Sequence, residues 1–386
     1  MDLVIIATLS ISWLYTFFRK GAIVAVSFLF VASTVAFFLF ASSAIDVLLK
    51  ALFAISFISL IKKSRRKGIV SVFILLLLLF AFINARYAIY DSTFKRIDCF
   101  TAYFSLFTGI FLQIVVIKED KCKYLLETLS RLAIYSLLLG IPLSLLGFKD
   151  YLGRWGTAIA GASISTDLSF FGTLGAAAAL FYYKLYRNPS YRYLAYINFF
   201  IVCSTLTRGG ILATAIILSF DFIPFVISII KNKKYYFAIL LSSIISIPAI
   251  SYILEALSIR NEAGDSGRSE AWAMLILLQE NFWIGNGYGF LKTRDDHAII
   301  AFTAAHNEYL HLFVEIGIIG IIIISFLFFI LFRNILKNSP IPRLLLIMFF
   351  ISFMTYSYTD NTITNFRFWI PFMTLLMILQ NINKKK

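Results

Sequence analysis

Apolar runs separated by short polar segments repeat from one end of the chain to the other. Each run is roughly 20 residues long, the length that a helix needs to cross a hydrocarbon core about 30 Å thick. We expect thirteen transmembrane helices, with twelve as the alternative count, and we expect the first run to be a span and not a removable signal. The expected spans are residues 3–18, 22–41, 45–61, 69–85, 98–117, 124–147, 164–183, 192–206, 211–230, 235–254, 307–332, 344–358 and 366–380.

Composition supports the same fold class. The chain has 386 residues, of which 60% are hydrophobic and 14% charged. Soluble globular domains average about 45–50% apolar and about 25% charged residues. The sequence therefore predicts an all-α polytopic membrane protein whose residues 1–386 form a single integral membrane domain.

The net charge of +15 would suggest a nucleic-acid partner in a soluble protein. Here the basic residues lie between the spans, so the positive-inside rule explains them and we expect no nucleic-acid partner. Six basic loops then share the cytoplasmic side: residues 62–67, 118–123, 184–192, 231–234, 333–343 and 384–386. The opposite side holds the N-terminus and five loops: residues 86–97, 148–163, 207–210, 255–306 and 359–365.

The largest loop on the outer side is residues 255–306. Ser269 is a good N-cap and Glu270 follows in the first turn, so a short helix is expected from there to about Trp283. The glycines of "GNGYG", residues 285–289, permit positive φ and should end it. We expect this helix to lie in the interface or to pack on the bundle.

Two arginines on the outer side are candidate anion ligands. Arg208, in "TLTRGGILA", stands at the end of one span and before a glycine pair. Arg268, in "GDSGRSEAW", stands just before a helix N-terminus. A guanidinium makes bidentate bonds to phosphate, and a helix start favours an anion. The structural alternatives are snorkelling to the interface for Arg208 and an exposed loop position for Arg268.

His306 lies where the outer loop enters the membrane, at the start of "HNEYLHLFVEIGIIG". A histidine that is neutral at working pH can accept a proton from a hydroxyl nucleophile, although capping of the following helix is the structural alternative. His311 and Glu315 are four residues apart and share a helix face, so we expect them to form a buried pair. Glu315 is half a turn out of phase with His306 and is not expected to orient it.

Other charged residues inside spans have structural explanations. Asp46 and Lys50 can pair at four-residue spacing, and Arg131, Asp167 and Asp221 are expected to face protein and not lipid. No cluster of histidine, cysteine and aspartate has ligand spacing, so we expect a reaction without a metal or another cofactor.

The set formed by "TRGG", "GR…AW…GNGYG" and "HNEYLHLFVEIGIIG" resembles the O-antigen ligase and O-antigen polymerase superfamily, which includes protein O-oligosaccharyltransferases. The diagnostic part covers residues 150–332. The resemblance implies a membrane glycosyltransferase of the GT-C type with catalytic residues Arg208, Arg268 and His306. It also implies weaker diphosphate contacts by Arg154, in "GRWGTAIAGAS", and by Asn307.

The resemblance implies a reaction as well. Such enzymes take a glycan from undecaprenyl pyrophosphate at the periplasmic face of the bacterial inner membrane and pass it, with inversion and without a metal, to an acceptor hydroxyl. The expected partners are that donor, membrane lipids, and either lipid A–core or a growing glycan as acceptor. Thirteen spans and an outer N-terminus depart from the family's usual twelve spans and cytoplasmic N-terminus.

Three functions remain open from the sequence. A ligase would attach finished O-antigen to lipid A–core, and we favour this function slightly. A polymerase would join O-antigen or capsule repeat units with the same donor chemistry. A transporter of the lipid-linked sugar would call for inverted repeats and charged residues near the midplane, which are not evident in the sequence.

Overall fold

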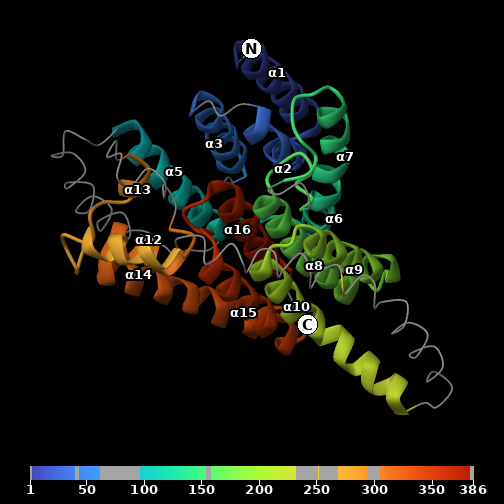
Figure 1. Ribbon diagram of the computed structural model, residues 1–386. Helices are drawn as coiled ribbons and strands as arrows, with labels where there is room; N and C mark the ends of the chain where they lie inside the picture. The colour runs from blue at the N-terminus through green and yellow to red at the C-terminus, as the bar shows by residue number, and fades with distance from the viewer. Residues whose placement is uncertain are drawn as a thin grey trace.

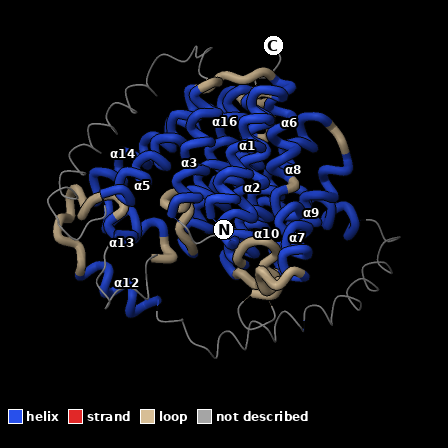
Figure 2. Tube along the Cα trace, turned by 90° about the horizontal axis from the view of Figure 1, so that it is seen from above, coloured by secondary structure: helices blue, strands red, loops and turns tan. Residues whose placement is uncertain are grey.

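The computed structural model describes residues 2–39, 43–60, 96–153, 158–231, 251, 268–293 and 305–382. These residues form helices joined by loops, without strands (Figure 2). The helices are α1 (Asp2–Lys20), α2 (Ala22–Leu39), α3 (Ser43–Ile58), α5 (Arg96–Phe111), η2 (Leu112–Ile114), α6 (Glu119–Ser130), α7 (Leu132–Leu145), α8 (Ser165–Tyr186), α9 (Pro189–Ser204), α10 (Arg208–Lys231), α12 (Arg268–Leu277), α13 (Phe290–Thr293), α14 (Glu308–Asn338), α15 (Arg343–Thr359) and α16 (Phe366–Asn381).

Most of the described helices overlap the residues of expected spans, whereas α12 and α13 lie in the predicted loop 255–306. Two predicted spans lie outside the described part of the chain. They are residues 69–85 and residues 235–254, of which only residue 251 is described. By length and composition, α8 and α14 could each cross a membrane, and the bent pair α6–α7 could form a third span, within the described residues. The apolar helices indicate a membrane protein.

The span predicted at residues 124–147 is bent and not straight. α6 and α7 meet at 49°, because Arg131 between them has the non-helical angles φ −111° and ψ 2°. Its guanidinium donates a hydrogen bond of 3.0 Å to the Tyr191 hydroxyl. The expectation that Arg131 faces protein is therefore confirmed.

The centre of the bundle is α8, which packs against α6, α7, α9, α10 and α16 (Figure 1). Every residue from Asp167 to Tyr182 is buried. The run Ala176–Ala179 is fully buried, and such small residues let neighbouring helices approach closely. α16 is buried along nearly its whole length, so these two helices form most of the core.

Charged groups inside the bundle are paired, as expected. Lys50 Nζ lies 2.6 Å from Asp46 Oδ2, and Arg192 Nε lies 2.6 Å from Asp221 Oδ2. Asp167 is 1% exposed and pairs with Arg367. A charged group in an apolar interior needs such a partner, so these contacts explain the charges predicted at positions 46, 50, 167 and 221.

Several helix ends meet at one end of the bundle, which we call the His306 end. The hydroxyl of Tyr356, near the end of α15, donates a 2.8 Å hydrogen bond to the Thr166 carbonyl at the start of α8. A Cβ atom at Gly209, in the first turn of α10, would overlap the side chain of Thr359, the last residue of α15. The glycine therefore brings the start of α10 directly against the end of α15.

Candidate active site

His306 stands immediately before α14 in a strained backbone conformation. Its φ of +48° lies in the left-handed region, which few residues other than glycine adopt. Asn307 follows as the N-cap, and its Oδ1 accepts hydrogen bonds from the backbone N–H groups of Tyr309 and Leu310 at 3.1 and 3.2 Å. The His306 side chain remains 41% exposed. Strain of this kind clusters at functional sites, and here it holds an accessible imidazole at the helix start.

Asp360 is the described carboxylate nearest to His306. His306 Nδ1 lies 3.4 Å from Asp360 Oδ1, in the loop between α15 and α16. The same oxygen accepts a 2.8 Å hydrogen bond from Asn361 N, which fixes the carboxylate relative to its own backbone. A donor Nδ1–H would leave the lone pair on Nε2. The sequence did not point to Asp360, because 54 residues separate the two.

His311 and Glu315 form the buried pair expected from their spacing. His311 Nε2 lies 3.1 Å from Glu315 Oε1, and both side chains are 1% exposed. Glu315 Oε1 also accepts a 3.2 Å hydrogen bond from Leu291 N, in α13. This pair is closed to a substrate and joins α14 to α13.

α14 is broken at Gly317, whose angles are φ +62° and ψ −173°. A Cβ atom there would overlap the backbone of Trp283 and Gly285, so only glycine fits. Four backbone hydrogen bonds replace those lost at the break: Asn286 N to Val314 O at 2.9 Å, Gly287 N to Glu315 O at 2.9 Å, Ile318 N to Phe282 O at 3.1 Å and Ile319 N to Trp283 O at 3.0 Å. The glycine in "EIGIIG" thus lets residues 282–287 dock onto α14.

The loop helix is shorter than predicted. α12 begins at Arg268 and ends at Leu277, whereas the sequence suggested an end near Trp283. The side chain of Asn281 accepts hydrogen bonds from Trp283 N and Ile284 N, at 3.1 and 3.2 Å, and this local turn competes with the helix. Gly285, Gly287 and Gly289 have the expected positive φ, of +73°, +109° and +91°. They do not end α12, however, because that helix already stops at Leu277.

Arg268 is the first residue of α12, and this helix packs beside α14 (Figure 1). Trp272, four residues later and therefore on the same helix face as position 268, donates from Nε1 to the Ala305 carbonyl at 2.8 Å. Its ring also meets that of Tyr358 edge to face at 6.2 Å. The start of α12 is thereby held against the residue that precedes His306.

Arg208 is the first residue of α10 and is exposed. Gly209 packs closely against Thr359, so the start of α10 lies beside the residue that precedes Asp360 in the sequence. The N-termini of α10, α12 and α14 therefore gather near the end of α15, and two of them start with an arginine. Helix N-termini carry partial positive charge, so the starts of α10 and α12 favour an anion, whereas the first N–H groups of α14 are already capped by Asn307.

A second polar cluster at the same end was missed by sequence reasoning. Arg367 pairs with Asp167, which also accepts a 2.7 Å hydrogen bond from Ser163 Oγ. Lys149 Nζ donates to the Gly161 carbonyl at 3.0 Å, and burial lowers the pKa of Lys149 to about 8, partly offset by Asp167 and Asp150. Arg154, predicted to contact diphosphate, lies in residues 154–157, outside the described part of the chain.

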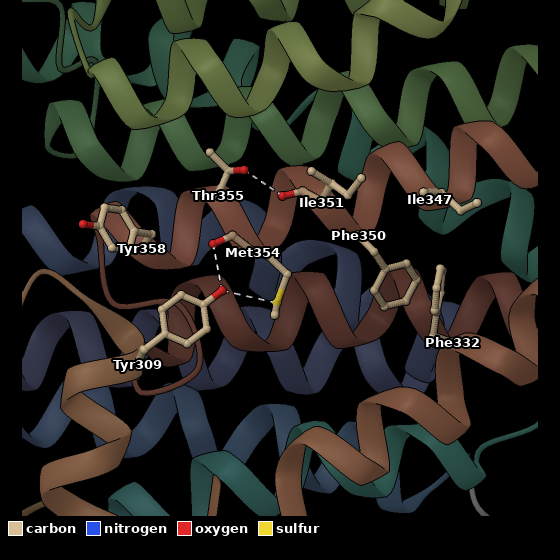
Figure 3. Close-up of a pocket in the computed structure, with 8 residues that line it drawn as sticks. All are labelled: Tyr309, Phe332, Ile347, Phe350, Ile351, Met354, Thr355 and Tyr358. Carbon is tan, nitrogen blue, oxygen red and sulfur yellow. Dashed lines mark hydrogen bonds between the residues drawn. The ribbon is translucent and has the colours of Figure 1, made fainter. Parts of the chain in front are cut away.

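An apolar groove of about 440 Å³ runs between α14 and α15 below the site. Figure 3 shows Tyr309 and Tyr358 at one end and Phe332 and Ile347 at the other. At the Tyr358 end, the Tyr309 hydroxyl donates to the Met354 carbonyl at 3.0 Å. Two residues of the groove are thus near the candidate site in the sequence: Tyr309 is three residues after His306, and Tyr358 is two residues before Asp360.

Within the described residues, no three histidine, cysteine, aspartate or glutamate side chains form a group that could hold a metal ion. The candidate site is instead built from a histidine, a carboxylate and arginines at helix starts.

Residues 193–325 match a family model described as O-antigen ligase. This match confirms the resemblance to the O-antigen ligase and O-antigen polymerase superfamily. The matched segment contains Arg208, Arg268 and His306, and it ends inside α14. Asp360 and Arg367 lie beyond it. No curated protein matches the chain. The family supports a ligase or polymerase type of activity, with a lipid-linked glycan and an acceptor as the substrates.

Proposed function

We propose that this protein transfers a glycan from undecaprenyl pyrophosphate to a sugar hydroxyl of lipid A–core at the periplasmic face of the inner membrane. The observation that carries the proposal is the meeting of His306, Asp360 and the arginine-bearing starts of α10 and α12 at one end of the bundle. A base and an anion site side by side are what this reaction needs.

In the proposed reaction His306 is the general base. It takes the proton of the acceptor hydroxyl as that oxygen attacks the anomeric carbon from the face opposite the diphosphate. The new bond forms between acceptor oxygen and anomeric carbon, the bond from that carbon to the phosphate oxygen breaks, and the configuration inverts. Asp360, 3.4 Å from Nδ1, holds the ring so that Nε2 can accept the proton.

Arg208 and Arg268 bind the diphosphate and stabilise the negative charge that grows on it as it leaves. A guanidinium is suited to this task because it stays charged and makes paired hydrogen bonds to phosphate oxygens. The helix N-termini add backbone donors at the same place. Arg154 and Asn307 are weaker candidates for the same anion. Of these, Asn307 already uses its side-chain oxygen to cap α14.

The groove between α14 and α15 offers a place for the polyprenyl chain of the donor. It is lined by apolar and aromatic side chains, opens to the exterior of the bundle and begins next to His306. A chain lying there would leave its diphosphate at the helix N-termini. The groove thus accounts for how a lipid-linked donor could reach the site from within the membrane.

The product on lipopolysaccharide distinguishes a ligase from a polymerase. In a strain lacking this protein, loss of a ligase leaves bare core together with unattached polymer on a lipopolysaccharide gel. Loss of a polymerase leaves core that carries one repeat unit, and that result would replace lipid A–core with a growing glycan as acceptor. Purified protein should also move glycan from lipid to acceptor in detergent. Movement of the lipid-linked sugar across a bilayer without transfer would overturn the enzymatic proposal.

A further inference from the structure

Glu308, the first residue of α14, is fully buried yet does not pair with a cationic side chain in any contact that the structure describes. Its carboxylate instead reaches the loop between α15 and α16. Oε2 accepts from Thr362 N at 2.5 Å and from Thr364 Oγ1 at 3.2 Å, and Oε1 accepts from Thr364 N at 3.1 Å. Three donors from one short loop therefore converge on one carboxylate.

That loop is the segment that carries Asp360. Its first residue is held by the end of α15, where Asp360 N donates to Tyr356 O at 3.0 Å. Its middle is held by the Glu308 carboxylate and by a 2.7 Å hydrogen bond between Ser357 Oγ and Thr362 Oγ1. The loop is thus anchored to the end of α15, and the Glu308 contacts tie it to the start of α14, the helix that His306 precedes.

We propose that Glu308 is a positioning residue that fixes Asp360 against His306 by clamping residues 362–364 to the start of α14. This inference rests on the proposed function, because it assigns Glu308 to the general base of that reaction. The His306–Asp360 contact is long at 3.4 Å and one partner is half-exposed. Such a pair does not hold two chain segments together, so its geometry has to be set by a stronger contact nearby.

A buried carboxylate can also serve only the fold, and the His311–Glu315 pair supplies the matched control. Glu308 and Glu315 lie on the same helix seven residues apart, and both are almost completely buried. In the contacts that the structure describes, Glu315 binds His311 and Leu291 N of α13, whereas Glu308 binds the Asp360 loop. Replacing either glutamate removes a buried charge, but only the Glu308 change should act through Asp360.

The test is a double-mutant cycle on the kcat of glycan transfer by detergent-purified full-length protein, with rates given per folded molecule. The variants are Glu308→Gln, Glu315→Gln and Asp360→Asn, alone and in pairs. We expect Asp360→Asn to lower kcat about 10-fold to 100-fold, which is part of the roughly 10²–10⁴ that a positioned base contributes. Glu308→Gln should lower kcat by a similar factor with KM unchanged, and it should add little to Asp360→Asn, because residues that act as one unit are not additive.

The milder variant Thr364→Val keeps the proposal testable if the Glu308→Gln protein does not fold. It removes one donor to the carboxylate and keeps the backbone contacts, so a smaller loss of kcat is expected, again not additive with Asp360→Asn. If the loss of kcat from Glu308→Gln or Thr364→Val multiplies in full with the loss from Asp360→Asn, the positioning role of Glu308 is overturned and the proposed function is not. Glu315→Gln is the control, because we expect any residual loss of kcat in this variant to multiply in full with that of Asp360→Asn. If Asp360→Asn transfers glycan at the normal rate, the base arrangement of the proposed function fails and the role of Glu308 fails with it.

Discussion

Two histidine–carboxylate pairs stand five residues apart at the start of α14, and they differ in almost every physical respect. His306 is 41% exposed and approaches Asp360 at 3.4 Å from a strained backbone position. His311 is 1% exposed and pairs with Glu315 at 3.1 Å within a regular helical turn. The first pair joins distant segments at the mouth of the site, whereas the second is local and closed.

The polar residues of "HNEYLHLFVEIGIIG" therefore have different tasks. A group that must exchange a proton with a substrate has to be reachable, and a buried pair is not. The buried His311–Glu315 pair instead places a carboxylate where α13 contacts α14, and that carboxylate accepts a hydrogen bond from Leu291 N. Glu308 shares a property with each pair. It is buried like Glu315, but it contacts the loop that carries Asp360.

The largest expected effect is the loss of activity on replacing His306. His306→Ala should lower the rate of glycan transfer by about 10²–10⁴ because it removes the proposed general base. The protein should keep its melting temperature in detergent, since the side chain is half-exposed. Transfer at a near-normal rate would show that another group accepts the proton.

His311→Ala should give the opposite result. Removing one partner leaves Glu315 buried without it, which costs about 3–5 kcal/mol in the free energy of unfolding. Thermal unfolding in detergent measures the loss, and transfer per folded molecule should persist. The double variant His311→Leu with Glu315→Leu should recover much of the stability, because an apolar pair carries no desolvation cost. A stable but inactive His311→Ala protein would mean that the two histidines have been assigned the wrong way round.

Arg208 extends the comparison to the anion site. Arg208→Ala should lower the transfer rate by about 10²–10³, the usual cost of one lost donor to a developing negative charge. Arg343 is the matched control, because it too is exposed and is the first residue of a helix, but it lies at the other end of α15. Arg343→Ala should leave transfer unchanged, and equal losses in both variants would remove the case for an anion site at Arg208.

The smallest expected effect concerns Lys149, whose burial is intermediate between those of the two histidines. Its pKa is lowered to about 8 from a usual 10.5, mainly by burial. Between these pH values the unfolded chain holds a proton that the folded protein has released, so stability should rise with pH across this window. In Lys149→Met the melting temperature should depend less on pH between 8 and 10.5. An unchanged slope would place the titrating group elsewhere.

Local patterns predicted the parts of this structure that depend on neighbours in the sequence. The helices follow from apolar runs, and the His311–Glu315 and Asp46–Lys50 pairs follow from four-residue spacing. Asp360 could not be predicted, because its link to His306 depends on how α15 and α14 pack. The same holds for Gly317, where a break in an apolar helix is explained only by the loop that docks there.

The end of α12 marks another limit. The apolar residues after Leu277 fit a continuing helix, but the side chains of Asn281 and Asn286 bind backbone groups of the following turn. Asn286 Nδ2 donates to the Leu278 carbonyl at 2.6 Å. These side-chain hydrogen bonds compete with a further turn of helix. The following turn is also supported by the backbone hydrogen bonds of residues 282–287 to α14, which cannot be read from the sequence.

Chemical rescue tests the central claim most directly. Glycine suits the positive φ at position 306, so His306→Gly should fold, and the space it leaves is open to solvent. We predict that added imidazole restores glycan transfer to His306→Gly in a concentration-dependent way, because it replaces the missing base. It should do nothing for the rate of His311→Gly, whose site is closed. Failure to rescue His306→Gly, or rescue of His311→Gly instead, would contradict the assignment of the His306–Asp360 pair to the reaction and of the His311–Glu315 pair to the fold.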